Sequence, residues 1–355
     1  MSALGQLRSA AREASGPGAR RRRWALAAFK TLLVVGALYL AWHLASRVAW
    51  PELAGRLRSA RGTLVAAALL CLLGRFAAVH LRWSLALGKV GIHPPHAIRL
   101  LSLASAVLIN HVTPTARLLG GVLRARYLRR RVASPFNRLY ATVLADQFSH
   151  HGVHAALTWV ALTVTAWTLE RFELAALLAA APLTLVAAAV LWSRARGPLQ
   201  SSGLLSWMTR RFAERRERRL GSLLASGRSL LERLREILSD RRLQGRMAAL
   251  SAAHLLLNAT AQWLLFAALG QQISFVTVIA AVALGTGAGF LSGTPGGVGT
   301  TEAAMIGCYV LLGLPQVDAA AATLLYRGLH YALVLALGLP SLVYLESSGS
   351  GRGPG

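Results

Sequence analysis

Residues 291–302 read LSGTPGGVGTTE, and they interrupt an apolar region that extends from residue 273 to residue 314. The interruption consists of four glycines, a proline and a carboxylate: Gly293, Gly296, Gly297, Gly299, Pro295 and Glu302. Backbone groups released by Gly and Pro cannot face lipid, so they occur at membrane depth only where protein or a water-filled cavity surrounds them. A charged side chain there costs roughly 2.5–3.5 kcal/mol and usually marks a pathway or a binding site. The stretch therefore predicts a broken helix at a functional site.

The composition is that of a polytopic membrane protein. Hydrophobic residues make up 55% of the 355 positions, and the mean hydropathy is +0.49. Several apolar runs reach the ~20 residues that cross a bilayer, which a soluble domain of this size would not contain. The first run, residues 24–45, follows a basic tail without a signal-peptide cleavage pattern. The two cysteines, Cys71 and Cys308, lie in apolar segments without metal-ligand spacing, which indicates structural roles.

The net charge of +26 would suggest a nucleic-acid partner in a soluble protein. Here the basic residues are nearly all arginines, and they lie in loops beside the apolar runs. That distribution is typical of the positive-inside rule and of attraction to anionic lipid head groups. Because nucleic-acid-binding motifs are also absent, we expect membrane lipids as partners and no nucleic acid.

The predicted organisation is one membrane domain between two tails. Residues 1–23 are expected to be a disordered basic cytoplasmic tail, residues 24–346 the transmembrane domain, and residues 347–355 a second disordered tail. Full spans are predicted at residues 24–45, 62–81, 139–169, 174–192, 247–269 and 319–345. Residues 193–246 form a basic cytoplasmic loop, where leucines at helical spacing from residue 220 to 238 predict an amphipathic helix on the inner leaflet. A solvated loop helix is the alternative.

Two further apolar segments are too short or too interrupted to cross. Residues 98–112 fall short of the ~20 required, and arginines and a lysine flank them on both sides, from Arg82 before and from residues 117–138 after. We interpret this segment as re-entrant from the cytoplasm and residues 273–314 as its counterpart from outside. The two breaks share Thr-Pro, at Thr113-Pro114 and Thr294-Pro295. Corresponding interrupted segments in two inverted halves point to a transporter's binding site.

The predicted fold class is therefore all-α: a polytopic helical membrane protein with about six full spans and two re-entrant or broken helices in inverted-repeat halves. Polar residues recur every fourth position in several spans and so share helix faces. They are His254, Asn258 and Gln262; Thr323, Arg327 and Tyr331, with His330 adjacent; and Asp146, His150 and His154. Since intramembrane charges usually pair, we expect Asp146 and Glu302 to face Arg75 and Arg327 across a hydrated cavity that binds an anionic head group. Purely structural ion pairs are the alternative.

Metal binding and catalysis are not predicted. Asp146, His150 and His154 have suitable ligand atoms, but a helical drift of about 40° per step spreads them apart. The run also lacks the HExxH arrangement, in which a Glu beside the first ligand acts as base. No nucleophile elbow, Walker loop or dinucleotide fingerprint is present. The sequence therefore predicts no metal site, no cofactor and no enzyme.

Three stretches carry a resemblance to a known family: GTPGGVGTTEAA at residues 293–304, ATLLYRGLHY at 322–331 and NHVTPTARLLGGVLRARYL at 110–128. Together they resemble the lysylphosphatidylglycerol synthase transmembrane-region family of flippase-like membrane proteins. The likeness extends over most of residues 60–345. It places Asn110, Pro114, Gly120, Gly121, Arg124, Pro295, Gly296, Gly297, Gly299, Glu302 and Arg327 at family motif positions. With Arg117 and Asp146 they form the predicted lipid-binding cavity. In many relatives an acid-Arg pair stands where this chain has Asp146-Gln147.

The resemblance implies a multi-pass protein of the cell (inner) membrane. Such a protein would bind an anionic or aminoacylated phospholipid, or a polyprenyl-phosphate-linked lipid, and translocate it between leaflets. In full-length synthases an aminoacyl-transferase domain follows this region, whereas here about ten residues follow the last span, so we expect no synthase activity. The alternative is a non-catalytic membrane subunit that docks a separately encoded glycosyltransferase or lipid synthase. A neighbouring gene for such an enzyme would favour the alternative.

The charge distribution also predicts the topology. Both termini, residues 117–138 and residues 193–246 should be cytoplasmic, because dense arginine opposes translocation. The measurement is labelling of single introduced cysteines in intact cells by an impermeant reagent, after replacement of Cys71 and Cys308. Labelling of the arginine-rich loop from outside would contradict this topology.

Overall fold

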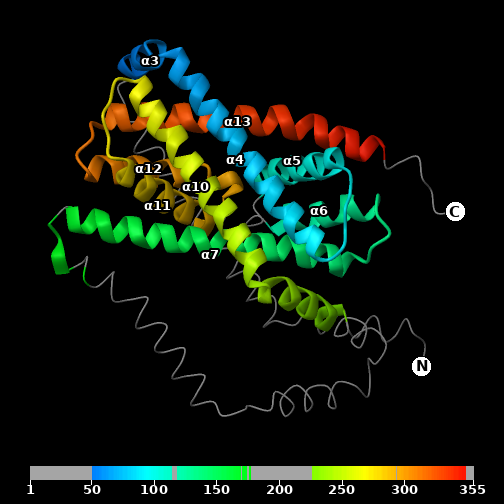
Figure 1. Cartoon of the computed structure of the whole chain (residues 1–355). Coiled ribbons are helices and arrows are strands. Elements are labelled where there is room, and N and C mark those ends of the chain that lie inside the picture. Colours follow the sequence, from blue (N-terminus) through cyan, green and yellow to red (C-terminus); the bar gives the residue numbers. More distant parts are fainter. Residues whose placement is uncertain are drawn as a thin grey trace, which may run out of the picture.

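The computed structural model describes residues 50–113, 118–168, 170–173, 176, 226–292 and 294–348 (Figure 1). These residues form helices and connecting turns, and none of them lies in a strand. This agrees with the predicted all-α class. The N-terminal tail, the span predicted at 24–45, and most of the segments predicted at 174–192, 193–246 and 347–355 lie outside the described residues.

The helices follow one another along the chain, with a further helical segment over residues 226–239 immediately before α10. The bounds are α3 (Trp50–Arg58), α4 (Gly62–Lys89), α5 (His96–Val112), α6 (Leu118–Arg129), α7 (Phe136–Thr168), α10 (Arg241–Ala268), α11 (Phe275–Ser292), the 3₁₀ turn η1 (Pro295–Gly297), α12 (Thr300–Leu311) and α13 (Gln316–Ser347).

Three of these helices, α4, α10 and α13, are long and apolar enough to cross a membrane. They contain the spans predicted at residues 62–81 and 319–345 and all but the last residue of the span predicted at 247–269. The span predicted at 139–169 lies in α7, whose 33 residues are sufficient in length. It is not one of those three, and Asp146 and three histidines interrupt its hydrophobic side chains. The total of six spans stays a prediction.

The two interrupted segments each form a pair of short helices. The 17-residue α5 is followed by the 12-residue α6, and the 18-residue α11 is followed by the 12-residue α12. In the second pair, Gly296 and Gly299 have φ angles of 60° and 82°. These left-handed angles are readily adopted only by glycine. The predicted break in the helix is thus confirmed, and it needs glycine for conformational reasons.

Helices α4 and α10 run antiparallel and pack along their whole length (Figure 1). At one end the Arg61 N–H donates to the Ala268 carbonyl at 3.0 Å. At the other end Lys89 Nζ donates to the Asp240 carboxylate at 2.6 Å, and Asp240 also caps α10 by accepting from the Leu243 N–H at 3.0 Å. These two hydrogen bonds, the one from Lys89 first, lower the pKa of the Asp240 carboxyl.

The helices form two groups, α4 to α7 and α10 to α13, and the same set of contacts recurs in each group. Within each group the two short helices pack on each other, and the second short helix packs on the last long one. Between the groups, α5 packs on α13, and α11 packs on α7. Each group therefore inserts its first short helix against the last helix of the other group.

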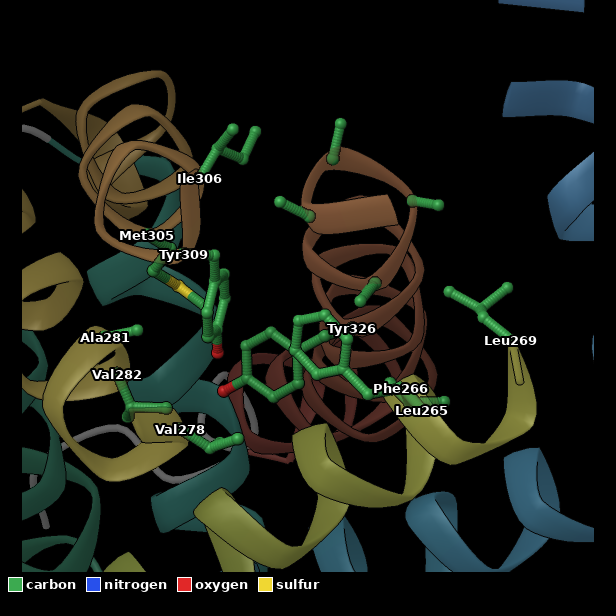
Figure 2. Close-up of a cluster of buried hydrophobic side chains, with 14 of the residues drawn as sticks. Leu265, Phe266, Leu269, Val278, Ala281, Val282, Met305, Ile306, Tyr309 and Tyr326 are labelled. Carbon is green, nitrogen blue, oxygen red and sulfur yellow. The ribbon is translucent and has the colours of Figure 1, made fainter. Parts of the chain in front are cut away.

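Two hydrophobic clusters hold the groups together. In one, Phe266, Tyr309 and Tyr326 bring α10, α12 and α13 into contact, and the rings of Phe266 and Tyr309 meet edge to face at 4.8 Å (Figure 2). In the other, Trp83 and Met247 are fully buried among residues of α4, α6, α7 and α10. The aromatic rings contribute large buried areas at these junctions.

The helical segment 226–239 differs in part from the sequence prediction. Leu234 and Ile237 are buried in the second cluster, against the membrane domain. Only Leu231 and Leu238 of its described leucine stripe are well exposed, and residues 220–225 lie outside the described part. The stripe is therefore used partly for packing on the protein, because apolar residues of α4, α7 and α10 are available at this site. Its binding to a leaflet stays a prediction.

The close approach of α11 and α12 generates a stability prediction. A Cβ on Gly289 would lie 2.1 Å from Thr301 Oγ1 and 3.2 Å from the Gly297 Cα, whereas a Cβ on Gly287 of the same helix meets nothing within 4 Å. Gly289→Ala should lower the free energy of unfolding by about 1–3 kcal/mol through overpacking. Gly287→Ala gains the same helix propensity and should be neutral or stabilising. Thermal unfolding in detergent measures both, and equal midpoints would contradict the packing shown here.

Candidate functional site

A polar cavity lies where the two groups of helices meet. It has about 80 Å³ of space for the centres of water molecules, and one water needs about 10–15 Å³. Seven helices contribute to its wall: α4, α5, α7, α10, α11, α12 and α13. The lining residues are Arg75, His111, His150, His154, His254, Leu255, Asn258, Gln262, Val282, Thr286, Thr301, Met305, Tyr326, Arg327 and His330.

The cavity wall is rich in hydrogen-bond donors and in cations. Five histidines and two arginines contribute, and none of the lining residues is a carboxylate. The polar stripe predicted on α10 faces this interior through His254, Asn258 and Gln262. In the stripe predicted on α7, His150 and His154 line the cavity, whereas Asp146 does not. Such a wall is suited to a ligand that accepts hydrogen bonds and carries negative charge.

Arg75 is the central cation of the cavity. Its Nη1 donates to Asn258 Oδ1 at 2.8 Å and to the Tyr326 hydroxyl at 3.3 Å, and its Nη2 contacts His330 Nδ1 at 2.7 Å. The Tyr326 hydroxyl also donates to Asn258 Oδ1 at 2.7 Å. The expectation that Arg75 faces Asp146 or Glu302 is wrong, because both carboxylates are engaged by other arginines.

The Arg75 contact orders two histidines in a row. An arginine can only donate, so His330 Nδ1 must accept, and a neutral His330 then carries its proton on Nε2. That nitrogen lies 2.9 Å from His111 Nε2, which accepts, while His111 Nδ1 donates to the Val107 carbonyl at 2.7 Å. The chain from Arg75 to Val107 is satisfied with both imidazoles neutral.

The broken helix is held by Glu302 and Arg327. One carboxylate oxygen of Glu302 accepts from the Gly299 N–H at 2.8 Å and so caps α12, and the other accepts from Arg327 Nε. Arg327 Nη2 donates to the Gly296 carbonyl at 3.0 Å and to the Tyr331 hydroxyl. The pair therefore satisfies backbone groups that the Gly/Pro break leaves without helical partners.

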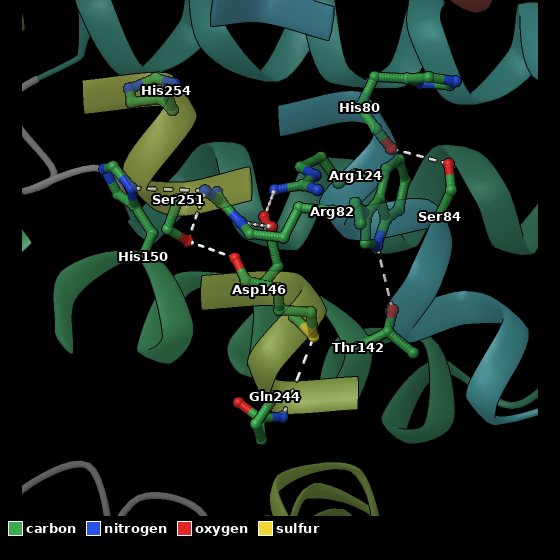
Figure 3. A network of polar contacts seen from close by, with 12 residues as sticks. His80, Arg82, Ser84, Arg124, Thr142, Asp146, His150, Gln244, Ser251 and His254 are labelled. Carbon is green, nitrogen blue, oxygen red and sulfur yellow. Dashed lines mark hydrogen bonds and ion pairs between the residues drawn. The ribbon is translucent and has the colours of Figure 1, made fainter. Parts of the chain in front are cut away.

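Asp146 forms a second buried network (Figure 3). Arg82 Nε donates to one carboxylate oxygen at 2.6 Å, and Arg124 Nη1 donates to the other at 2.8 Å. Arg82 also donates to the Ser251 hydroxyl at 3.1 Å, and the Arg124 guanidinium lies 4.1 Å from the centre of the Trp83 ring. All three charged side chains are at most 7% exposed, so the network joins α4, α6, α7 and α10 inside the protein.

The assignment of Arg82 to the exposed basic flank before residues 98–112 is wrong. The predicted span ended at residue 81, whereas α4 continues to Lys89 and keeps Arg82 2% exposed in the interior. The apolar pattern ends early because Arg82 is itself a polar residue within the helix. Residue spacing could not identify Asp146 as the partner of Arg82, because Arg82 lies on α4 and Asp146 lies on α7.

The other predicted site residues take structural positions around these networks. Asn110 Oδ1 accepts from the Gly120 N–H at 2.9 Å, and a Cβ on Gly120 would lie 2.4 Å from the same oxygen. Gly121 faces Val143 of α7. Pro295, Gly296, Gly297 and Gly299 form the break, while Pro114 and Arg117 lie outside the described residues. The break therefore sets the course of the backbone between α11 and α12, whereas other residues supply most of the polar groups of the cavity wall.

Of the predicted site residues described here, Arg327 alone lines the cavity. Sequence reasoning missed His111 and Tyr326, although each stands next to a motif residue, Asn110 or Arg327. It also missed Arg82 and Ser251 as partners in the Asp146 network. Attention to polar residues directly beside motif positions would have found the first two.

The two buried ion pairs occupy matching places in the two groups of helices. Asp146 follows Thr113 by the same number of residues as Arg327 follows Thr294. In each group the second short helix supplies the opposite charge: Arg124 from α6 and Glu302 from α12. The arrangement recurs with the charges exchanged between the two helices.

Long apolar helices around a polar cavity and two buried ion pairs define a helical integral membrane protein. Residues 27–338 match the family described as "Lysylphosphatidylglycerol synthase TM region", and the chain belongs to this family. This confirms the resemblance drawn from the motifs.

Two relatives come from Methanothermobacter thermautotrophicus, and both are described as "UPF0104 membrane protein". One is 28% identical over 277 residues, which cover 76% of this chain and 81% of the relative. The other is 38% identical over 76 residues, which cover 21% of this chain and 23% of the relative. The descriptions of both relatives agree with a membrane protein and assign no activity.

The Glu302–Arg327 pair generates a prediction about stability. Arg327→Gln leaves a buried carboxylate without its cation and should cost about 3–5 kcal/mol, seen as a lower unfolding midpoint in detergent. The Glu302→Gln, Arg327→Gln double variant removes both charges and should regain part of the loss. Lys89→Gln breaks the pair with Asp240, whose side chains are 34% and 30% exposed, and should lower the midpoint far less because solvent screens that pair. A double variant less stable than Arg327→Gln alone would contradict direct pairing.

Proposed function

We propose that this protein binds a lipid with a phosphate-bearing head group in the polar cavity and moves that lipid between the two leaflets. The observation that carries the proposal is the cavity wall, with two arginines, five histidines and no carboxylate among its lining residues. Phosphate is well matched to such donors, and arginine binds it through charge-assisted hydrogen bonds. The long apolar helices α4, α10 and α13, which contribute to the cavity wall, support access by a lipid.

Arg75 is the proposed anchor for the anion. The Arg327 charge is balanced by Glu302, whereas the described hydrogen-bond partners of Arg75 are Asn258, Tyr326 and His330. Among the described ion pairs, none includes Arg75. A cation at membrane depth is costly without a counter-charge. An anionic head group would provide that charge.

The proposal of movement rests on the internal repetition of the fold. We interpret α4 to α7 and α10 to α13 as inverted repeats, with α5–α6 and α11–α12 as re-entrant pairs. The antiparallel α4 and α10, the recurring contacts and the matching ion pairs support this interpretation. Inverted repeats around a midplane site are typical of transporters that work by alternating access. In this proposal the protein moves the lipid without catalysis, and both termini are cytoplasmic.

The alternative is a non-catalytic subunit that docks a glycosyltransferase or lipid synthase. A lipid-exchange assay in vesicles distinguishes it from the proposed function. Vesicles that contain the purified protein and fluorescent phosphatidylglycerol, or a fluorescent polyprenyl phosphate, should exchange the labelled lipid between leaflets faster than vesicles without protein. Wild-type protein that binds these lipids but leaves the exchange rate unchanged would favour the docking role.

The same vesicles test the anchor. Arg75→Gln should lower lipid exchange by about tenfold or more, because a charge-assisted hydrogen bond contributes about 1.5–3 kcal/mol. Arg75→Lys keeps the charge and should retain part of the activity. Arg58→Gln, on the exposed face of α3, is the matched control and should behave like wild type. Thermal unfolding verifies that each variant is folded. Wild-type exchange by folded Arg75→Gln protein would overturn the assignment.

A further inference from the structure

Two apolar grooves lie beside the polar cavity. The first lies between α7, α10 and α11, and the second lies between α4, α5 and α13. The first is lined by His154, Leu157, Thr158, Leu255, Leu256, Ala259, Ile279, Val282 and Ala283. The second is lined by Leu72, Arg75, Phe76, Ala104, Val107, His330, Leu333, Val334 and Leu337. Each has about 20 Å³ of space for water-sized spheres, which suits a short piece of a hydrocarbon chain.

Both grooves border the cavity and share wall residues with it. His154, Leu255 and Val282 line the first groove and the cavity together, and Arg75 and His330 do so for the second. The shared residues stand between each groove and the cavity, and most of the remaining groove wall is aliphatic or aromatic. In the first groove Leu256 is 45% exposed, so that groove reaches the outer face of the helices.

The grooves have equivalent walls in the two groups of helices. Each is formed by the first long helix and the first short helix of one group, together with the last long helix of the other group. The contacts of α11 on α7 and of α5 on α13 are the packing that creates them. Two separate openings of the same construction are what alternating access from two leaflets requires.

We infer that the two grooves are paired portals for the lipid, each of which seats the first methylene groups of one hydrocarbon chain while the head group occupies the cavity. The inference rests on the proposed function and extends it to the path of the chain. A head group inside the protein must leave its chain in the bilayer, and only an apolar opening lets a chain pass between helices without burying polar groups against it. One portal serves each leaflet.

The first experiment locates the chain in the wild-type protein. Phosphatidylglycerol with a photoreactive diazirine near the ester end of its acyl chain is incorporated into vesicles with the protein, and labelled peptides are identified by mass spectrometry after irradiation. Labels should map to the first groove, around residues 255–259 and 279–283, and to the second groove, around residues 104–107 and 333–337. A diazirine at the far end of the chain is the control and should leave both grooves unlabelled. Labelling of one groove only, or of neither, would overturn the paired portals.

The second experiment blocks each groove. Ile279→Trp fills the first and Leu337→Trp fills the second, and each should lower lipid exchange about tenfold or more because overpacking excludes the chain. Leu284→Trp and Leu335→Trp are controls on the same helices, at exposed positions outside both grooves. They should exchange lipid like wild type.

Binding of glycerol 3-phosphate separates the two proposals. It should be unchanged in the folded groove variants, because the cavity is intact, and it should be weakened by Arg75→Gln. If wild-type protein moves lipid and depends on Arg75, but folded Ile279→Trp and Leu337→Trp proteins move it equally well, the portals are wrong and the proposed function stands. If wild-type protein neither binds glycerol 3-phosphate nor moves lipid, the proposed function itself fails.

Discussion

The ion pair between Glu302 and Arg327 is the interaction on which the broken helix depends. A helix interrupted inside a membrane protein leaves backbone groups without partners, and lipid cannot supply them. Glu302 accepts from the Gly299 N–H, and Arg327 donates to the Gly296 carbonyl, so each charge of the pair also satisfies the backbone beside it. Glycine allows the left-handed angles of the break, and these two side chains supply the hydrogen bonds that Gly296 and Gly299 lack within a helix.

The same constraint, that a buried charge needs an opposite charge, organises the other half of the molecule. Asp146 receives hydrogen bonds from two arginines on two different helices, Arg82 and Arg124. Asp146 and Glu302 are thereby engaged, and the buried Asp318 pairs with Arg56, so Arg75 is left with Asn258, Tyr326 and His330 as its partners in the cavity wall. The excess of positive charge in the cavity follows from this distribution, and it is the physical basis of the proposed preference for an anionic head group.

Histidines surround that charge. The ordered chain from Arg75 through His330 and His111 to the Val107 carbonyl is complete without a further proton. It holds the imidazoles in defined tautomers and connects α4, α13 and α5 across the two groups of helices. The cavity therefore combines one fixed cation with side chains that can reorient their hydrogen bonds toward a phosphate or toward water.

Local chemistry made the helices and the break predictable from the sequence. Apolar runs at 62–81, 98–112, 247–269 and 319–345 predict helices because hydropathy depends only on neighbouring residues, and Gly-Pro chemistry at 291–302 predicts the break for the same reason. The Glu302–Arg327 pair agrees with the expectation from the sequence, whereas the partners of Asp146 were not predictable. Whether Asp146 meets Arg75 or Arg82 depends on where α4 ends and how α4 and α7 are rotated against each other. The cavity wall likewise comes from seven helices that are far apart in the chain, so only tertiary packing could decide which polar faces meet.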